Sequence, residues 1–213
     1  MRPPRPSWRS PAVVLAAAYA AGAVPFSNMA ARRTRGVDLR GVGTGTVSGT
    51  ALYRVAGFGP LAVAGVCDVA KGSVGPLLAG RDRPVLAAIS GGLAVVGHNW
   101  SPFLGGAGGR GVSPAMGALA PHQPAGAAFL LAGLTVGRLG GESAIGVLLA
   151  DLAMVPLLAR LGRRRGGLAG AAVVVPMVVK RLLGNARPAA PGPGVYLWRL
   201  LLDRDGPASD AGA

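Results

Sequence analysis

The chain has 213 residues, of which 51% are hydrophobic and only 14% are charged, and its mean hydropathy is +0.46. A water-soluble domain carries about a quarter charged residues, so these values exclude an ordinary soluble fold and predict an all-α, multi-pass membrane protein. The formal net charge of +14 sits between apolar runs and forms no continuous basic face. That pattern argues against nucleic-acid binding and is typical of loops that flank membrane spans.

The first apolar run covers Pro11 to Ala31 and follows a basic N-terminal flank, residues 1–10. A cleaved signal peptide and a retained first span are both consistent with such a run. We favour the retained span, because Pro25-Phe26-Ser27-Asn28 continues without a secreted type of domain behind it.

A charged connector ending at Arg40 leads into the first glycine-rich loop, Gly41 to Gly49. Glycines allow backbone N–H groups to point inward as an anion-binding nest, and a guanidinium such as that of Arg40 suits phosphate. A helix that begins near this loop would add its positive N-terminal end. The alternative is a flexible linker between helices. The loop also offers four hydroxyl groups, on Thr44, Thr46, Ser48 and Thr50.

The second apolar run, Ala51 to Ala79, is predicted as one span. It contains Asp68 and Lys71, which lie one turn apart on the same helical face. Ionisable residues inside a span are costly and are functional candidates, although these two could simply pair and orient the helix. Cys67 is the only cysteine, so no internal disulfide is possible.

A hydrophilic turn at Arg81-Asp82-Arg83-Pro84 precedes a third span, from Val85 to about Trp100. The second glycine-rich loop, Gly105 to Gly111, follows His98 and contains Arg110. It lacks the Gly-Lys-Ser/Thr ending of a Walker loop. His98 also lacks the acidic residue, four or five positions on, that a His–Asp acyltransferase pair would need.

The remaining chain predicts one half-helix and three spans. Val112 to Ala120 is too short to cross a bilayer at 1.5 Å per residue, and Arg160 to Arg165 forms a basic loop. The spans run from about Ala125 to Val136, from Glu142 to Ala159 with Asp151 inside, and from Leu168 to Val179. We therefore expect about seven transmembrane helices, some of them short, in a single domain at residues 11–187.

Orientation follows from the positive charges. The connector from Arg32 to Arg40, Arg110 and the Lys180-Arg181 pair indicate one common, cytoplasmic side. The Arg163-Arg164-Arg165 cluster then falls on the other side if the half-helix counts as a crossing. The tail, residues 188–213, is expected to be partly disordered, with an interfacial stretch from Val195 to Leu202.

Two glycine-rich loops that carry arginine, together with a basic third element, predict a phosphate-binding site at the membrane surface. The sequence supplies neither a carboxylate pair nor a strong nucleophile, so catalysis would rest on positioning and charge stabilisation. It also has no zinc-type spacing of Cys and His, so we expect no zinc site.

The order of these motifs resembles that of the bacterial acyl-phosphate-dependent glycerol-3-phosphate acyltransferases, the PlsY family, over about residues 12–188. The resemblance rests on Val24-Pro25-Phe26, Gly36-Val37-Asp38-Leu39-Arg40, Asp68-Val69-Ala70-Lys71-Gly72, the His98 loop ending Gly108-Gly109-Arg110-Gly111-Val112, and Lys180-Arg181-Leu182-Leu183. It implies a bacterial plasma-membrane enzyme with cytoplasm-facing glycine-rich loops that needs neither a metal nor a cofactor. Such an enzyme transfers a fatty acyl group from acyl phosphate to the 1-hydroxyl of glycerol 3-phosphate and gives lysophosphatidate for phospholipid synthesis.

Carried onto this chain, the resemblance implies two sets of site residues. The expected catalytic residues are Thr44, His98 and Arg110. The expected substrate-binding residues are Arg40, Gly43, Gly45, Thr46, Thr50, Asp68, Lys71, Gly108, Gly109, Gly111, Lys180 and Arg181.

The chain departs from the family pattern at several polar positions. Thr46 and Ala51 stand where the family's first loop has asparagines, Ala107 stands at a usual lysine, and Val175-Pro176-Met177-Val178 replaces a His-Arg-x-Asn motif. These losses leave open a non-catalytic paralogue that binds a phosphorylated lipid or metabolite, or that scaffolds a lipid-synthesis enzyme. A small anion transporter, with a path lined by Asp68, Lys71 and Asp151, is a third interpretation.

Overall fold

A computed structural model describes residues 9–188 and 191–206, and every long element in this part of the chain is an α-helix. The all-α prediction is therefore confirmed for the described residues. The partial disorder expected of residues 188–213 falls in part on 189–190 and 207–213, which lie outside the described residues, whereas residues 193–202 are helical. The α-helices are α1 (Pro11–Ala23), α2 (Phe26–Arg35), α3 (Gly49–Ala56), α4 (Phe58–Ala79), α5 (Pro84–Asn99), α6 (Val112–Leu119), α7 (Pro124–Leu139), α8 (Ser143–Leu183) and α9 (Pro193–Leu202).

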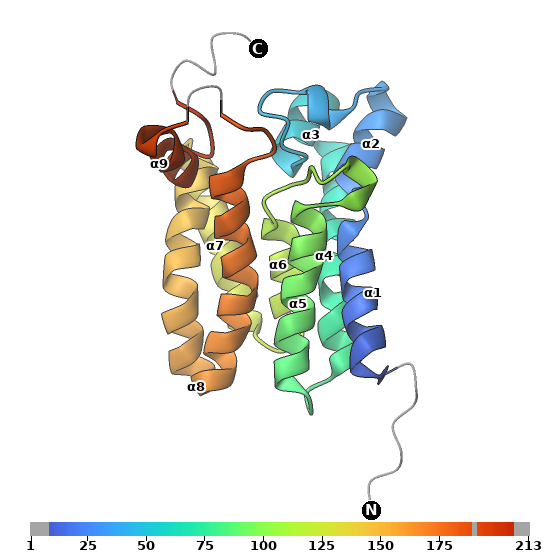
Figure 1. Ribbon diagram of the computed structural model, residues 1–213, viewed down its shortest axis with the longest axis vertical. Coiled ribbons are helices and arrows are strands. Elements are labelled where there is room, and N and C mark those ends of the chain that lie inside the picture. Colours follow the sequence, from blue (N-terminus) through green and yellow to red (C-terminus); the bar gives the residue numbers. More distant parts are fainter. Residues whose placement is uncertain (1–8, 189–190, 207–213) are drawn as a thin grey trace, which may run out of the picture.

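The long helices form an upright bundle, and the loops of interest gather at one end of it (Figure 1). The start of α1 and the α4–α5 turn lie at the lower end in this view, whereas α2, α3, α9 and both glycine-rich loops lie at the upper end. The predicted meeting of the two loops on one side of the bundle is therefore present.

Helix α8 is a hairpin of two arms, Ser143–Gly162 and Arg164–Leu183. A Cβ atom on Gly166 would lie 2.0 Å from the carbonyl oxygen of Leu158, a contact that requires the chain to reverse between them. The reversal lies within the basic segment predicted as a loop, but it is much tighter than a loop because the helical conformation continues up to it on both sides.

Four helical stretches are long and apolar enough to cross a membrane by length and composition. They are Pro11–Arg35, Phe58–Ala79 and the two arms of α8. Helix α7 is a shorter apolar helix, and α6 has only 8 residues, in agreement with the predicted half-helix.

Two predicted spans are interrupted as helices, although the first lies within the candidate membrane stretch Pro11–Arg35. The run Pro11–Ala31 breaks at Val24, because the residue before Pro25 is pushed out of the helical region. The run Ala51–Ala79 breaks at Gly57, whose φ of 81° lies in the region that favours glycine. As a result α2 and α3 form short helices at the loop end of the bundle, and α4 crosses alone (Figure 1).

Small residues bring the helix backbones into direct contact, as expected of helices packed in lipid. A Cβ atom on Gly22 in α1 would lie 2.2 Å from the carbonyl oxygen of Ala94 in α5. A Cβ atom on Gly72 in α4 would lie 2.0 Å from that of Pro114 in α6. Helix α1 is therefore packed into the bundle, which supports its interpretation as a retained span.

Helix α9 contains the whole of the predicted interfacial stretch, Val195–Leu202, and docks against the end of α8. Its Arg199 is buried, and its guanidinium donates hydrogen bonds to the carbonyl oxygens of Leu182, Leu183 and Ala186 at the end of α8. Tyr196 and Trp198 remain partly exposed. The tail thus covers the end of α8 beside the glycine-rich loops (Figure 1).

Candidate functional site

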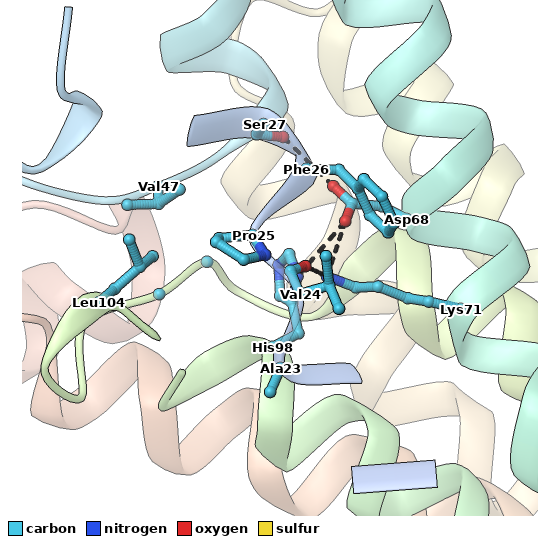
Figure 2. A pocket seen from close by; sticks show the side chains of 12 residues that line it. Ala23, Val24, Pro25, Phe26, Ser27, Val47, Asp68, Lys71, His98 and Leu104 are labelled. Carbon is cyan, nitrogen blue, oxygen red and sulfur yellow. Dashed lines mark hydrogen bonds and ion pairs between the residues drawn. The ribbon is translucent and has the colours of Figure 1, made fainter. Parts of the chain in front are cut away.

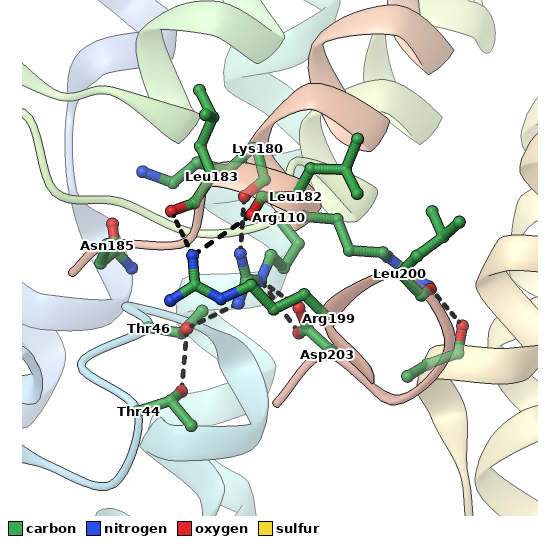
Figure 3. Close-up of polar contacts among 12 residues, drawn as sticks. Thr44, Thr46, Arg110, Lys180, Leu182, Leu183, Asn185, Arg199, Leu200 and Asp203 are labelled. Carbon is green, nitrogen blue, oxygen red and sulfur yellow. Dashed lines mark hydrogen bonds and ion pairs between the residues drawn. The ribbon is translucent and has the colours of Figure 1, made fainter. Parts of the chain in front are cut away.

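Three segments distant in sequence meet at the loop end of the bundle: the first glycine-rich loop, the second, and the end of α8 (Figure 3). The backbone N–H of Val47 donates to the carbonyl oxygen of Gly108 over 3.1 Å, which joins the two loops directly. A cluster of buried apolar side chains, including Leu39, Leu52 and Leu104, supports them from below.

The first loop takes the turn that its glycines make possible. Gly43 and Gly45 have φ angles of 54° and 69°, in the left-handed region. The turn brings the hydroxyl oxygens of Thr44 and Thr46 to 3.0 Å from each other. Ser48 then caps α3 by accepting a hydrogen bond from the N–H of Ala51.

The second loop needs its glycines because it passes against His98. A Cβ atom on Gly108 would lie 2.2 Å from the carbonyl oxygen of His98, and one on Gly109 would lie 2.2 Å from its Nε2 atom. Gly111, with φ of 81°, ends the loop as the N-cap of α6. His98 thus supports the second loop from beneath.

Arg110 connects all three segments. Its Nη2 donates to the hydroxyl of Thr46 over 3.3 Å, and its Nη1 donates to the carbonyl oxygen of Lys180 over 2.8 Å. Its Nε forms an ion pair with Asp203, 2.6 Å from Oδ1. The side chain is 12% exposed, so the guanidinium lies just below the surface. The Arg110–Thr46 hydrogen bond joins predicted site residues of the two loops through their side chains.

Two residues of this cluster were missed by the sequence analysis. Asn185 donates through Nδ2 to the carbonyl oxygens of Gly45, over 3.1 Å, and Gly108, over 2.9 Å, and its Oδ1 accepts from the N–H of Gly108. It therefore clamps the two loops together. One feature of the sequence could have indicated Asn185: it directly follows Gly184, the residue with positive φ that ends α8.

Asp203, the second missed residue, comes from the end of α9. Burial raises the pKa of its carboxyl above the usual value, whereas the nearby charges of Arg110, Arg181 and Arg199 lower it. The acid therefore lies in a partly desolvated, cationic environment. No motif in the sequence links position 203 to the loops, and only the docking of α9 brings it there.

Asp68 and Lys71 form a closed ion pair beneath the site (Figure 2). The Lys71 Nζ lies 2.7 Å from Oδ1 of Asp68 and also donates to the carbonyl oxygen of Val24, and Ser27 donates to Asp68 through its hydroxyl. The two side chains are 3% and 5% exposed. The pairing interpretation is thus favoured over direct phosphate binding, and over a path for a transported anion.

His98 lies next to this pair, but not within hydrogen-bonding distance. Its Nδ1 is 3.8 Å from Oδ1 of Asp68, which is too long for a hydrogen bond. The small cavity beside His98, Lys71 and Gly109 measures about 10 Å³, room for about one water molecule. His98 is thereby placed to orient the second loop.

The side chains of four other predicted residues take no part in the Arg110–Thr46 contact, although the backbone carbonyl of Lys180 accepts from Arg110. Arg40 pairs with Asp38 at 2.8 Å, an interaction that lowers the pKa of the Asp38 carboxyl and raises that of Arg40. Thr50 is exposed on α3. Lys180 and Arg181 are buried, the first with Nζ 5.2 Å from the centre of the Trp100 ring, the second donating to the carbonyl oxygens of Ala144 and Leu200.

A family model and several curated proteins that match this chain carry the same description, glycerol-3-phosphate acyltransferase. A protein-family model described as glycerol-3-phosphate acyltransferase matches residues 12–188. The glycerol-3-phosphate acyltransferase of Thermus thermophilus is 37% identical over 150 residues, which cover 68% of this chain and 74% of that protein. That of Rhodospirillum rubrum is 37% identical over 164 residues, which cover 70% and 75%. With the acyltransferases of Shouchella clausii and Deinococcus radiodurans, the chain spans about half the length of the relative, 52% and 57%.

The fold matches two solved structures. The crystal structure of PlsY (YgiH), an integral membrane glycerol 3-phosphate acyltransferase, in its glycerol 3-phosphate form superposes with a TM-score of 0.73 at 23% sequence identity. The match covers 80% of this chain and 88% of that one. The lysophosphatidic acid form gives a TM-score of 0.69 at 21% identity. Together with the apolar helices, the match shows a multi-pass membrane fold.

Proposed function

Because the chain belongs to the glycerol-3-phosphate acyltransferase family, we propose that it acylates the 1-hydroxyl of glycerol 3-phosphate and uses acyl phosphate as the donor. The acceptor hydroxyl attacks the acyl carbonyl carbon, a new ester bond forms, and the bond from that carbon to the phosphate oxygen breaks. The hydroxyl proton passes to a phosphate oxygen. The products are lysophosphatidate and inorganic phosphate, and residues 11–187 form the acyltransferase domain.

The observation that carries this proposal is the contact between Arg110 and Thr46, which assembles two glycine-rich loops around one guanidinium. Backbone N–H groups of the loops and the Thr44 and Thr46 hydroxyls provide hydrogen bonds for phosphate oxygens, and Arg110 provides the charge. Stabilisation of the phosphate leaving group is the chemistry that such an arrangement can supply. His98 positions the second loop, and the acceptor's own phosphate assists the loss of the hydroxyl proton.

The topology belongs to the same proposal. Seven passes, formed by α1, α4, α5, α6, α7 and the two arms of α8, bring the start of α1 and the end of α8 to opposite ends of the bundle, as Figure 1 draws them. The loop end then faces the cytoplasm of a bacterial cell. The arginines of α2 near that end support this orientation.

The direct test offers acyl phosphate and radiolabelled glycerol 3-phosphate to the purified protein in detergent. We expect labelled lysophosphatidate, and we expect Arg110→Ala to reduce kcat/KM by about 10²-fold or more, since one preorganised charge contact in a transition state has about that value. Arg54→Ala, an exposed arginine on neighbouring α3, is the matched control and should retain activity. Absence of product at high protein concentration, with phosphate binding retained, would identify a non-catalytic paralogue instead.

A further inference from the structure

A second cavity, of about 380 Å³, lies at the end of the bundle opposite the glycine-rich loops. It exists because α6 has only 8 residues, about 12 Å of helix, so the chain turns into α7 before reaching the level of the neighbouring helix ends. Figure 1 shows the α6–α7 turn above the lower ends of α5 and α8. The recess lies between the α4–α5 turn and the reversal of α8, where Arg81 and Arg165 line it.

The charges at this cavity have one sign. Arg81 and Arg165 are both exposed, and neither guanidinium has an ion pair or hydrogen bond with the part of the chain that the structure describes. The described residues that line the cavity include no carboxylate. The N-terminus of α7, at Pro124, adds its partial positive charge. An anionic group is therefore the complementary ligand.

The deeper lining has a different character, with small apolar side chains such as Ala88, Ala118 and Val173 from three helices. This part suits a hydrocarbon chain. One polar group remains to be satisfied: His122, whose Nε2 lies 3.0 Å from the carbonyl oxygen of Pro76. A carbonyl oxygen can only accept, so Nε2 is the donor. The other ring nitrogen, Nδ1, is buried and has no hydrogen-bond partner among the described residues.

We propose that this cavity binds an anionic phospholipid, with its phosphate at Arg81 and Arg165 and part of one acyl chain against the apolar wall. Its volume lies within the range of small-molecule sites, which accommodates the head group and the first part of a chain while the remainder stays in the bilayer. The position also fits, because Arg81 lies in the α4–α5 turn and Arg165 at the start of the second arm of α8, both at one end of the bundle, where lipid head groups would lie. The site is separate from the glycine-rich loops and does not depend on the acyltransferase proposal.

The test compares thermal stability and native mass spectra of the delipidated protein with added phosphatidylglycerol, phosphatidylcholine or inorganic phosphate. We expect phosphatidylglycerol to raise the unfolding temperature and to give a one-to-one adduct. The variant Arg81→Gln with Arg165→Gln should weaken this binding by about tenfold or more, since each arginine near an anionic lipid contributes about 1 kcal/mol. Arg160→Gln with Arg164→Gln removes two charges from the same region but none that line the cavity, and should leave binding unchanged.

Three results would overturn the proposal. Equal binding of phosphatidylcholine would show that head-group charge is irrelevant. Equal loss in the two double variants would show a diffuse charge effect. An effect of inorganic phosphate that disappears in Arg81→Gln with Arg165→Gln would assign the cavity to free phosphate rather than lipid. All the exchanged arginines are on the exterior, so the variants should fold, and acyltransferase activity is not part of the readout.

Discussion

Substitution of Asn185 tests how the two glycine-rich loops are held together, because its side chain bonds to both. Replacing it with alanine removes the donors to Gly45 and Gly108 and the acceptor for the Gly108 N–H. Each lost hydrogen bond costs about 0.5–1.5 kcal/mol, and the loops should become misplaced relative to each other. We therefore expect kcat to fall about tenfold or more in the radiolabel assay, while the fold persists.

Asn185→Asp provides the comparison for that variant. It retains the oxygen that accepts from Gly108, but it loses both donor contacts and places a carboxylate oxygen against the carbonyl oxygens of Gly45 and Gly108, so its activity should lie at or below that of Asn185→Ala. Equal activity in all three proteins would mean that the loops hold each other without this side chain.

Asp203 neutralises part of the charge that Arg110 could offer to phosphate. Because its carboxylate pairs with Nε of Arg110 in a mostly desolvated position, Asp203→Asn should strengthen the binding of phosphate groups. We expect KM for glycerol 3-phosphate, and the inhibition constant of inorganic phosphate, to fall about threefold to tenfold, in line with about 1 kcal/mol of released charge interaction.

Asp205→Asn is the matched control, because Asp205 pairs with Arg199 rather than Arg110. It should leave both constants near their native values. A rise in KM for Asp203→Asn would show instead that Asp203 orients Arg110 for binding.

The raised pKa of Asp203 also predicts the direction in which folding stability changes with pH. Its carboxyl has a raised pKa in the folded protein, so the fold binds its proton more tightly than the unfolded chain does. This residue's contribution to stability is therefore fully present below the ordinary aspartate pKa and is lost as the pH rises through the raised value. Thermal unfolding of native protein and Asp203→Asn across acidic pH should show the difference shrinking at the lowest pH.

At the scale of the helices, close backbone contact holds the bundle together. Gly72 and Gly65 both lie on α4, yet a Cβ atom on Gly72 would lie 2.0 Å from the Pro114 carbonyl oxygen, whereas one on Gly65 meets nothing within 4 Å. Gly72→Ala should destabilise the protein by about 1–3 kcal/mol through overpacking of α4 against α6.

Gly65→Ala should be neutral or stabilising by up to about 1 kcal/mol, because alanine favours the helix. The two unfolding temperatures in detergent check the pair. Equal temperatures would mean that α4 and α6 can separate at little cost.

At the scale of the whole molecule, the proposed topology puts α2 and the reversal of α8 on opposite sides of the membrane. In a Cys67→Ala background, Arg33→Cys and Arg164→Cys place single thiols at these two exposed positions. We expect an impermeant maleimide added to intact cells to label position 164 and not position 33. Labelling of both, or of 33 alone, would contradict the orientation.

Much of the helical frame could be predicted, because runs of apolar residues bounded by arginine and proline have few alternatives in lipid. The half-helix Val112–Ala120 and the reversal in Arg160–Arg165 both correspond to features of the structure. The breaks at Val24 and Gly57 were missed, since hydropathy averages over the one or two residues whose backbone angles interrupt a helix.

The candidate site likewise has features that the sequence predicted and features that it did not. Local sequence by itself indicated the two glycine-rich loops and Arg110, because glycine and a guanidinium carry their conformational and charge properties wherever they lie. Only the tertiary structure decided that Lys71 forms an ion pair with Asp68, that Asn185 bonds to both loops, and that Asp203 pairs with Arg110. These pairings depend on how α4, α8 and α9 pack, and contacts between residues far apart in the chain leave no periodic trace in its sequence.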